Sequence, residues 1–308
     1  MSAPARAALL RGTLAVVLSA CCFGSISPLT VVATDHGMAL QSIQAWRYTA
    51  SAVVLMAVAL WRPPAPRSAG VAAWTAPQVL VVAGGGQALV ATLALAALRW
   101  LPTATASFLF YTFPAWVTIL SALRGHEPLD RTRVTALLLA LGGIGAMVGA
   151  PDATALHSIG LTLILAGALV YALYIPVLDR LQRARDPLDV SRAIAVGGSV
   201  IFATWAAVTG TLFAIPDGVA FGASVLQGVL SAVSFLGFLA GLRVLGPVRT
   251  AITSTVEPFW TTLLGVVMLG QGITVGTVVG GLGIMGAVLL LQRPVAATAS
   301  RSSSHAAS

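Results

Sequence analysis

Charged residues are scarce in this sequence. Only 8% of its 308 residues are Asp, Glu, Lys or Arg, whereas 57% are hydrophobic. A soluble domain carries about 25% charged residues, because its surface must face water. The shortage of charge excludes an ordinary soluble domain and predicts a chain for which lipid is the main solvent.

Lysine is absent altogether. All 17 basic residues are arginines, and the formal net charge is +8. A basic balance can indicate nucleic-acid binding, but these arginines form short clusters between apolar runs, which is typical of membrane topology signals. No nucleic-acid partner is therefore expected.

Residues that hold metals or cofactors are also few. The two cysteines, Cys21 and Cys22, are neighbours in an apolar run, and no CxxC, HExxH or nucleotide-binding pattern occurs. The four histidines fall in loops or in the tail. The sequence therefore predicts no metal site, no cofactor and no enzymatic activity. An intramembrane enzyme and a non-transporting receptor or structural protein remain the alternatives.

Long apolar runs dominate what is present. Each is near the roughly 20 residues that a helix needs to cross a bilayer core. Continuous apolarity favours helices over barrel strands, whose sequences alternate. The predicted fold class is an all-α polytopic membrane protein of about ten transmembrane helices. The expected spans are residues 12–33, 41–61, 78–98, 103–122, 134–151, 159–178, 191–213, 219–241, 248–270 and 273–292.

The arginines predict an orientation. With the N-terminus in the cytoplasm, every arginine except Arg47 and Arg99 lies on the cytoplasmic side, as the positive-inside rule requires. We expect a multi-pass protein of the cell membrane (inner or plasma membrane) with both termini cytoplasmic. Residues 1–11 are the predicted cytoplasmic N-terminus, and the Ala/Ser-rich residues 293–308 are a predicted disordered cytoplasmic tail.

The sequence also repeats itself. The segment LAALRWL from Leu95 corresponds to LAGLRVL from Leu239. With the same offset, PAWVTIL from Pro114 matches PFWTTLL from Pro258. The repeats contain five helices each, and an odd number makes the second copy enter from the opposite face. Such inverted-topology repeats are characteristic of secondary transporters, which bind their solute near the midplane between the halves.

The repeat sets the expected domain organisation. A first repeat covers residues 12–151, an outer loop covers 152–158, and a second repeat covers 159–292. Each repeat supplies five of the expected spans. We therefore expect the solute site where the two repeats meet.

The repeated segments resemble a known family. The runs LAALRWLPTATASFLFYTFPAWVTIL and LAGLRVLGPVRTAITSTVEPFWTTLLGVVMLGQ resemble the drug/metabolite transporter superfamily, specifically an EamA-type permease with two EamA repeats. The resemblance implies a secondary transporter, expected to be an exporter, of a small metabolite, amino acid or drug-like solute. It also implies alternating access and coupling to an ion such as the proton. The implied partners are a small-molecule solute and the lipid bilayer.

Two charged residues fall inside predicted spans. Glu257 is about nine residues into its span, roughly 14 Å deep, and Arg47 is about six residues into its span, roughly 9 Å deep. A buried carboxylate is costly unless it is paired, hydrated or protonated, so Glu257 is predicted to contact solute or couple protons. Satisfying the backbone near Pro258 is its alternative role. For Arg47 three interpretations stay open: an ion pair with Glu257, contact with an anionic solute, or snorkelling to the outer interface.

Matched prolines are candidates for hinges, since interruptions at equivalent positions of two halves mark binding regions in transporters. They are Pro28 with Pro176 and Pro114 with Pro258.

Aromatic and polar side chains within the spans are further candidates for solute contact. Helix packing is the alternative use of each. The candidates are Tyr111, Tyr171, Tyr174, Trp116, Trp260, Gln44, Gln87 and Ser234, together with Ser25 and Ser231.

Small residues at four-residue spacing occur in the fifth and tenth spans. They are Gly145 with Gly149 and Gly276 with Gly280. This spacing lets helices approach closely, so it predicts either packing between the halves or a contact in a homodimer.

Overall fold

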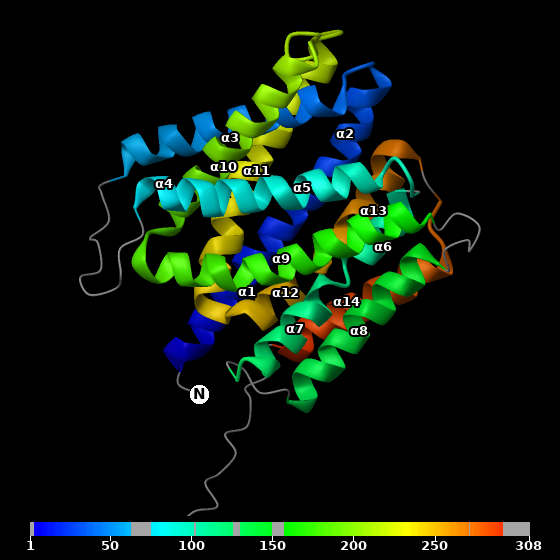
Figure 1. The fold of residues 1–308 in the computed structure, drawn as a ribbon. Helices are drawn as coiled ribbons and strands as arrows, with labels where there is room; N and C mark the ends of the chain where they lie inside the picture. The colour runs from blue at the N-terminus through cyan, green and yellow to red at the C-terminus, as the bar shows by residue number, and fades with distance from the viewer. Residues whose placement is uncertain are drawn as a thin grey trace, which may run out of the picture.

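The computed structural model describes residues 3–62, 75–101, 103–125, 130–149, 157–270 and 272–291. Every secondary-structure element in these ranges is helical, and the helices pack side by side as long rods (Figure 1). Within these ranges, seven helical segments are long and apolar enough to cross a membrane. The prediction of an all-α polytopic membrane protein is therefore confirmed.

The first half supplies five spans, three of which are made of more than one helical segment. In chain order they are α1 (Ala3–Gly24) with α2 (Ile26–Asp35); α3 (Leu40–Trp61); α4 (Ala76–Val79) with the π-helix η1 (Leu80–Gly85) and α5 (Gly86–Ala97); α6 (Thr103–Phe110) with α7 (Phe113–Leu123); and α8 (Arg131–Val148).

The second half repeats the layout with fewer interruptions. Its spans are α9 (Ser158–Ala184); α10 (Pro187–Val208); α11 (Gly218–Leu245); α12 (Pro247–Thr253) with α13 (Val256–Leu269); and α14 (Val275–Leu291).

The first helix begins earlier than the predicted span. It starts at Ala3 rather than at Gly12 and runs through Arg6 and Arg11. The residues before Gly12 are mostly Ala, Leu and Arg, which are strong helix formers. Hydropathy marks only where the apolar run starts. The helix extends beyond the run because the residues before it also favour the helical conformation.

The two halves pack mainly on each other. The second spans of both halves meet as α3 on α10, and the fifth spans meet as α8 on α14. The first span of each half packs on the third span of the other half, as α1 on α11 and α9 on α5. It also packs on the fourth span of the other half, as α1 on α13 and α9 on α7. Contacts that recur with the halves exchanged are what two inverted copies related by a pseudo-two-fold axis produce.

Small residues account for the closest of these contacts. Any Cβ at Gly276 or Gly280 of α14 would collide with the carbonyl oxygen of Ala146 or Gly143 on α8. Gly276 and Gly280 therefore pack between the two halves, as one of the two predicted alternatives had it. The other alternative, a homodimer contact, stays a prediction. On α8 the close residue is Gly143, whereas a Cβ at Gly145 would meet no atom of α14 within 4 Å, so packing between the halves does not apply to Gly145 and its homodimer alternative stays a prediction.

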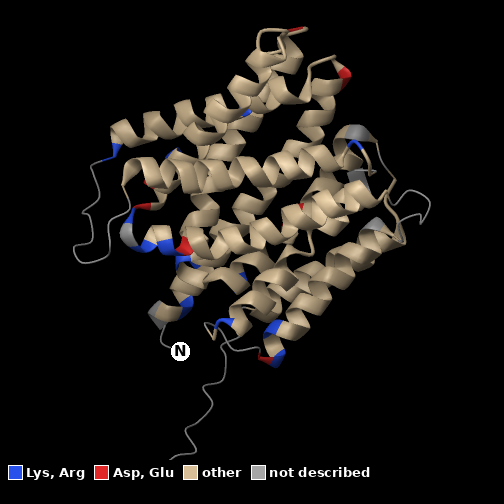
Figure 2. Ribbon diagram, viewed as in Figure 1, with Lys and Arg blue, Asp and Glu red and all other residues tan. Residues whose placement is uncertain are grey.

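The charged residues of the described ranges lie mostly toward the ends of the helices, and few lie along the middle of the bundle (Figure 2). Many large apolar side chains are instead exposed on the outer surface, among them Leu138, Val200 and Leu289. Lipid is the solvent that such a surface suits. The few charges that remain inside therefore need an explanation.

Candidate functional site

Two spans are interrupted at matched positions. The fourth span leaves the helix at Tyr111, between α6 and α7, and the ninth leaves it at Ser254, between α12 and α13. A proline follows each break, Pro114 as the second residue of α7 and Pro258 as the third residue of α13. Because proline lacks a backbone N–H and disfavours the helical conformation before it, each proline explains its break.

The first span is also broken, at Ser25, three residues before Pro28. The missing N–H of Pro28 leaves the carbonyl of Gly24 without its helical donor. The Thr261 hydroxyl on α13 donates to that carbonyl at 2.9 Å. Beside it, Trp260 Nε1 donates to Ser25 Oγ at 3.0 Å. The broken first span is thus fastened to α13, close to the break of the ninth span.

Pro176 behaves differently from its predicted partner Pro28. The helix α9 continues through Pro176 without interruption. The structure therefore places no helix break at Pro176, and a hinge at this proline stays a prediction. Groups on neighbouring helices can compensate for a single lost hydrogen bond in a membrane helix, so a proline alone does not determine that the helix breaks.

Glu257 lies in the first turn of α13, directly after the break. Free backbone N–H groups and the positive end of the helix dipole favour a carboxylate at such a position. Its side chain is half-buried and lies close enough to the Tyr111 hydroxyl for the two groups to interact electrostatically. The matched breaks of the two halves therefore meet through Glu257 and Tyr111.

Arg47 points into the protein, with only 8% of its surface exposed. Its Nε donates to Ser231 Oγ at 3.0 Å, its Nη1 to Gln44 Oε1 at 3.0 Å, and its Nη2 to the Tyr48 hydroxyl at 3.5 Å. Its guanidinium carbon also lies 4.8 Å from the centre of the Tyr48 ring, as in a cation–π contact. Snorkelling to the interface is therefore wrong, because polar acceptors inside the bundle hold the side chain.

The predicted ion pair is not formed either. Among the described residues, no carboxylate forms an ion pair with Arg47. Glu257 is near enough to feel its charge electrostatically, but not in direct contact. Of the three interpretations of Arg47, contact with an anionic solute is the one that stays open as a prediction.

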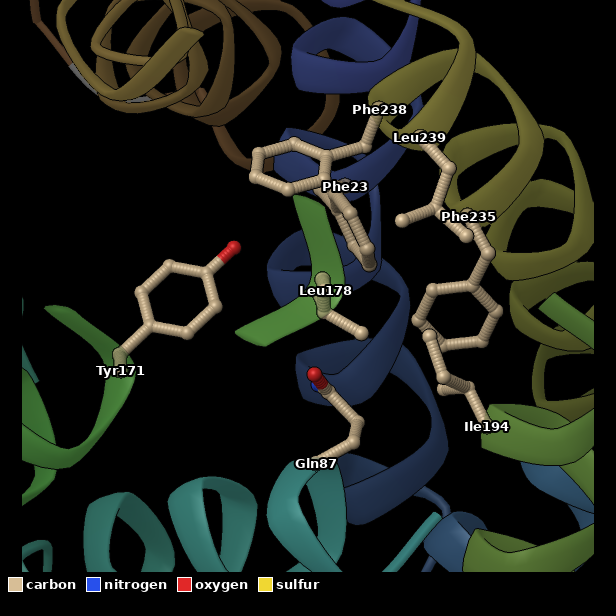
Figure 3. Close-up of a pocket in the computed structure, with 8 residues that line it drawn as sticks. All are labelled: Phe23, Gln87, Tyr171, Leu178, Ile194, Phe235, Phe238 and Leu239. Atoms are coloured by element: carbon tan, nitrogen blue, oxygen red, sulfur yellow. The ribbon is translucent and has the colours of Figure 1, made fainter. Parts of the chain in front are cut away.

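A small cavity lies between the two halves. Figure 3 shows the Tyr171 hydroxyl and the Gln87 amide pointing into it from the neighbouring helices α9 and α5, while the rest of the lining is apolar. Its free volume is about 10 Å³, which is room for about one water molecule. An organic solute therefore needs the surrounding helices to move apart. The lining residues are Phe23, Gln87, Tyr171, Leu178, Ile194, Phe235, Phe238 and Leu239.

Several predicted site residues serve packing instead. Tyr174 donates to the Ala83 carbonyl at 2.5 Å. Ser234 and Ser19 each donate to the other's carbonyl, at 3.2 and 2.8 Å. Trp116 is 38% exposed and does not line the cavity. These contacts hold helices together and leave the side chains little freedom to contact a solute.

Two buried polar residues escaped the sequence analysis. Tyr48 is fully buried and stacks on Phe202 and Phe235, with ring centroids 5.3 and 6.2 Å apart. Gln227 is fully buried in α11, one turn before Ser231. A glutamine inside an apolar run was the available signal for Gln227. The sequence did not single out Tyr48, because tyrosines are common in spans near the membrane–water interface.

Comparison with known proteins agrees with this architecture. The model of a family described as the EamA-like transporter family matches residues 10–149 and 158–293. The two matches divide the chain as the two structural halves do.

Two individual proteins are similar to this chain. An inner membrane transporter of Salmonella typhimurium (strain LT2), YicL, described as uncharacterized, is 27% identical over 190 residues, which is 61% of this chain and 63% of that protein. The match thus spans less than two thirds of the relative. A protein of known crystal structure, 21% identical, superimposes with a TM-score of 0.75 over 91% of this chain and 95% of its own. At that identity the likeness supports the fold alone.

Proposed function

Because this chain belongs to the EamA-like transporter family and is a membrane transporter, we propose that it exports a small organic solute by alternating access, as a secondary transporter. One observation carries the proposal: the interrupted fourth and ninth spans meet at Glu257 and Tyr111, between inverted halves. Interrupted helices that meet near the midplane are where secondary transporters bind solutes and coupling ions.

The arrangement of the halves supports alternating access. Since the contacts of one half recur in the other with the roles exchanged, a second arrangement with inward and outward roles reversed is built from similar contacts. The cavity at Gln87 and Tyr171 is too small for an organic solute in the conformation described. Rocking of one half against the other opens it to one face at a time.

Glu257 is the proposed coupling residue. A carboxylate that gains and loses a proton changes its electrostatic interaction with the Tyr111 hydroxyl, and with it the interaction between the two breaks. The proposed orientation places both termini in the cytoplasm and the bundle in the inner or plasma membrane. The basic residues Arg183 and Arg243 in the last turns of α9 and α11 support it, since both helices end at the same face.

The first test is transport itself. Purified protein in liposomes and empty liposomes are loaded with the same mixture of amino acids, organic acids and other metabolites, and an inward or outward pH gradient is imposed. We expect at least one solute to leave the protein-containing vesicles faster, and a solute profile identical to that of empty vesicles under every gradient contradicts the proposal. Neither an enzyme nor a receptor would move solute in this assay.

Coupling is tested with Glu257→Gln. The amide keeps the size of the side chain and one acceptor oxygen, but it cannot exchange a proton. We expect pH-gradient-driven export to fall at least tenfold, while solute exchange without a gradient persists, because loss of an essential coupling group typically removes the driven step. Asp189→Asn makes the same chemical change outside the site and should behave as wild type. Full export and an unaltered pH dependence in Glu257→Gln would exclude the coupling role.

A further inference from the structure

The charge of Arg47 has no negative partner in direct contact. All three of its hydrogen bonds go to neutral oxygens, those of Ser231, Gln44 and Tyr48. A buried cation in a membrane protein is costly, and it usually pairs with an anion or lines a pathway. Neutral acceptors orient the guanidinium without neutralising it, and Glu257 interacts with it only at a distance, so the side chain remains able to bind an anion directly.

A second donor lies on the same side of the bundle. Gln227 Oε1 accepts a hydrogen bond from the Thr30 hydroxyl at 3.2 Å, whereas Gln227 Nε2 has no partner in the described ranges although the residue is fully buried. Gln227 shares a helix face with Ser231, which binds Arg47, because the two are one turn apart. The backbone at Gly228 also lies against the Arg47 carbonyl. The register of α3 and α11 therefore brings the unpaired amide to the level of the guanidinium.

This polar cluster borders the cavity. The Tyr48 hydroxyl lies 3.5 Å from Arg47 Nη2 and 3.5 Å from Gln87 Nε2, so a single oxygen joins Arg47 to a cavity-lining residue. The Tyr48 ring stacks on Phe235, which lines the same cavity. A small movement of Gln87 or Tyr48 would place the guanidinium directly at the cavity wall.

The second half offers no equivalent cation. Arg47 and Ile194 occupy the same position in α3 and α10, seven residues after the first residue of each helix. Ile194 lines the cavity. The two copies therefore present one cation and one apolar wall, which suits a solute with a single anionic group and an apolar remainder.

We propose that Arg47 and Gln227 form an anion subsite, and that the solute is a small monocarboxylate with an apolar or aromatic body. The planar fork of a guanidinium matches the two oxygens of a carboxylate. A phosphate ester would bring up to two negative charges to one cation in a weakly polar interior, so the carboxylate is favoured. Phe23, Phe235 and Phe238 provide the surface for the apolar body. That this solute is transported rests on the proposed function, whereas its binding does not.

Binding is measured first, on the full-length protein in detergent. The probes are phenylacetate with phenylacetamide, and N-acetyl-L-leucine with N-acetyl-L-leucinamide, because each pair differs only in the charge of one group. Thermal unfolding is followed as each probe is titrated. We expect each acid to raise Tm at concentrations at least about tenfold lower than its amide, the ratio expected for a charge-assisted hydrogen bond.

Variants then assign the preference to the subsite. Arg47→Gln should bind acid and amide equally, Gln227→Met should reduce the preference, and Arg47→Lys should keep part of it because the charge remains. Arg243→Gln loses the same charge at an exposed site at the end of α11 and should match wild type. If Arg47→Gln does not fold, as judged by gel filtration, then Gln227→Met and Arg47→Lys carry the test.

The outcomes separate the two proposals. The subsite is overturned if wild type binds the acid and amide of each pair equally, if it binds none of the four probes, or if the folded variants keep the full preference. The same probes are then followed in liposomes. Preferential binding of the acids without movement of any solute supports the subsite and contradicts transport, whereas transport without acid preference supports transport and contradicts the subsite.

Discussion

At the scale of single residues, the interrupted first span depends on one hydroxyl group. The Gly24 carbonyl that Pro28 leaves without a donor accepts its hydrogen bond from Thr261. In lipid, an unsatisfied backbone carbonyl is costly because no water replaces the lost donor. The hydroxyl therefore stabilises the break and ties it to α13 at the same time.

This dependence makes a double-mutant cycle informative. Thr261→Val should lower the free energy of unfolding by about 1–3 kcal/mol, because it leaves the Gly24 carbonyl unsatisfied. In a Pro28→Ala background the new N–H of residue 28 reaches that carbonyl, so the same substitution should cost clearly less. Unfolding of the four proteins in detergent gives the coupling. Equal costs in the two backgrounds would show that the hydroxyl does not replace the missing N–H.

The sequence identified the unusual charged residues inside the spans, but it did not predict the direction in which each side chain points. Depth in a span singled out Arg47, which is buried, and Glu257, which follows the break of the ninth span. The same reasoning proposed Trp116 for the cavity, although it is exposed, and left out Gln227. In a span that is apolar on all sides, hydrophobic periodicity does not mark the inward face, so the direction of a side chain follows from tertiary packing.

At the scale of helices, the contact of α8 with α14 depends on missing side chains. The helix backbones approach so closely at Gly276 that the carbonyl oxygen of Ala146 occupies the place of a Cβ. Contacts of this kind hold membrane helices together by packing, because lipid provides no hydrophobic drive for helices to associate.

A pair of glycines in one helix tests this contact. Gly276→Ala should destabilise the protein by about 1–3 kcal/mol, the usual cost of overpacking. Gly286→Ala, also in α14, meets no atom within 4 Å of its new Cβ and should be neutral or slightly stabilising. Thermal unfolding of both variants gives the comparison. Similar Tm values for the two would mean that α8 and α14 separate at little cost.

The helical segments were predictable in part. Apolar runs located the spans, and the repeat paired them. The sequence did not distinguish Pro28, whose span is broken, from Pro176, whose helix continues. At Pro28 a neighbouring span supplies the donor for the freed carbonyl, because Thr261 donates to Gly24, and no local sequence pattern contains that information.

At the scale of the whole molecule, one contact joins the two halves at their predicted outer end. His36 follows α2, Asp217 precedes α11, and the side chains form an ion pair with Nδ1 and Oδ2 2.5 Å apart. Asp217 also caps α11 by accepting the Ala220 N–H at 2.8 Å. Hydrogen bonds from the Ala220 backbone and then from His36 lower the pKa of Asp217.

The sign of the resulting pH dependence follows from linkage. A carboxyl whose pKa is lower in the folded state stabilises that state above the ordinary aspartate pKa of about 4, and the contribution is lost as the pH falls through the folded value. Asp217→Asn keeps the cap but not the charge. We expect wild type to have the higher Tm at neutral pH, and the gap to close as the pH falls below about 4. A gap that is unchanged down to about pH 3 would contradict the assignment.

The burial of Arg47 places a fixed charge inside the electric field of the membrane. Moving one elementary charge through the full potential changes the energy by about 2.3 kcal/mol per 100 mV. In the proposed alternating-access cycle, opening of the cavity to the other face would redistribute the field around Arg47 even if the side chain stays still. Voltage would then bias the balance between the proposed inward and outward forms, and a carboxylate bound at Arg47 would cancel much of that bias.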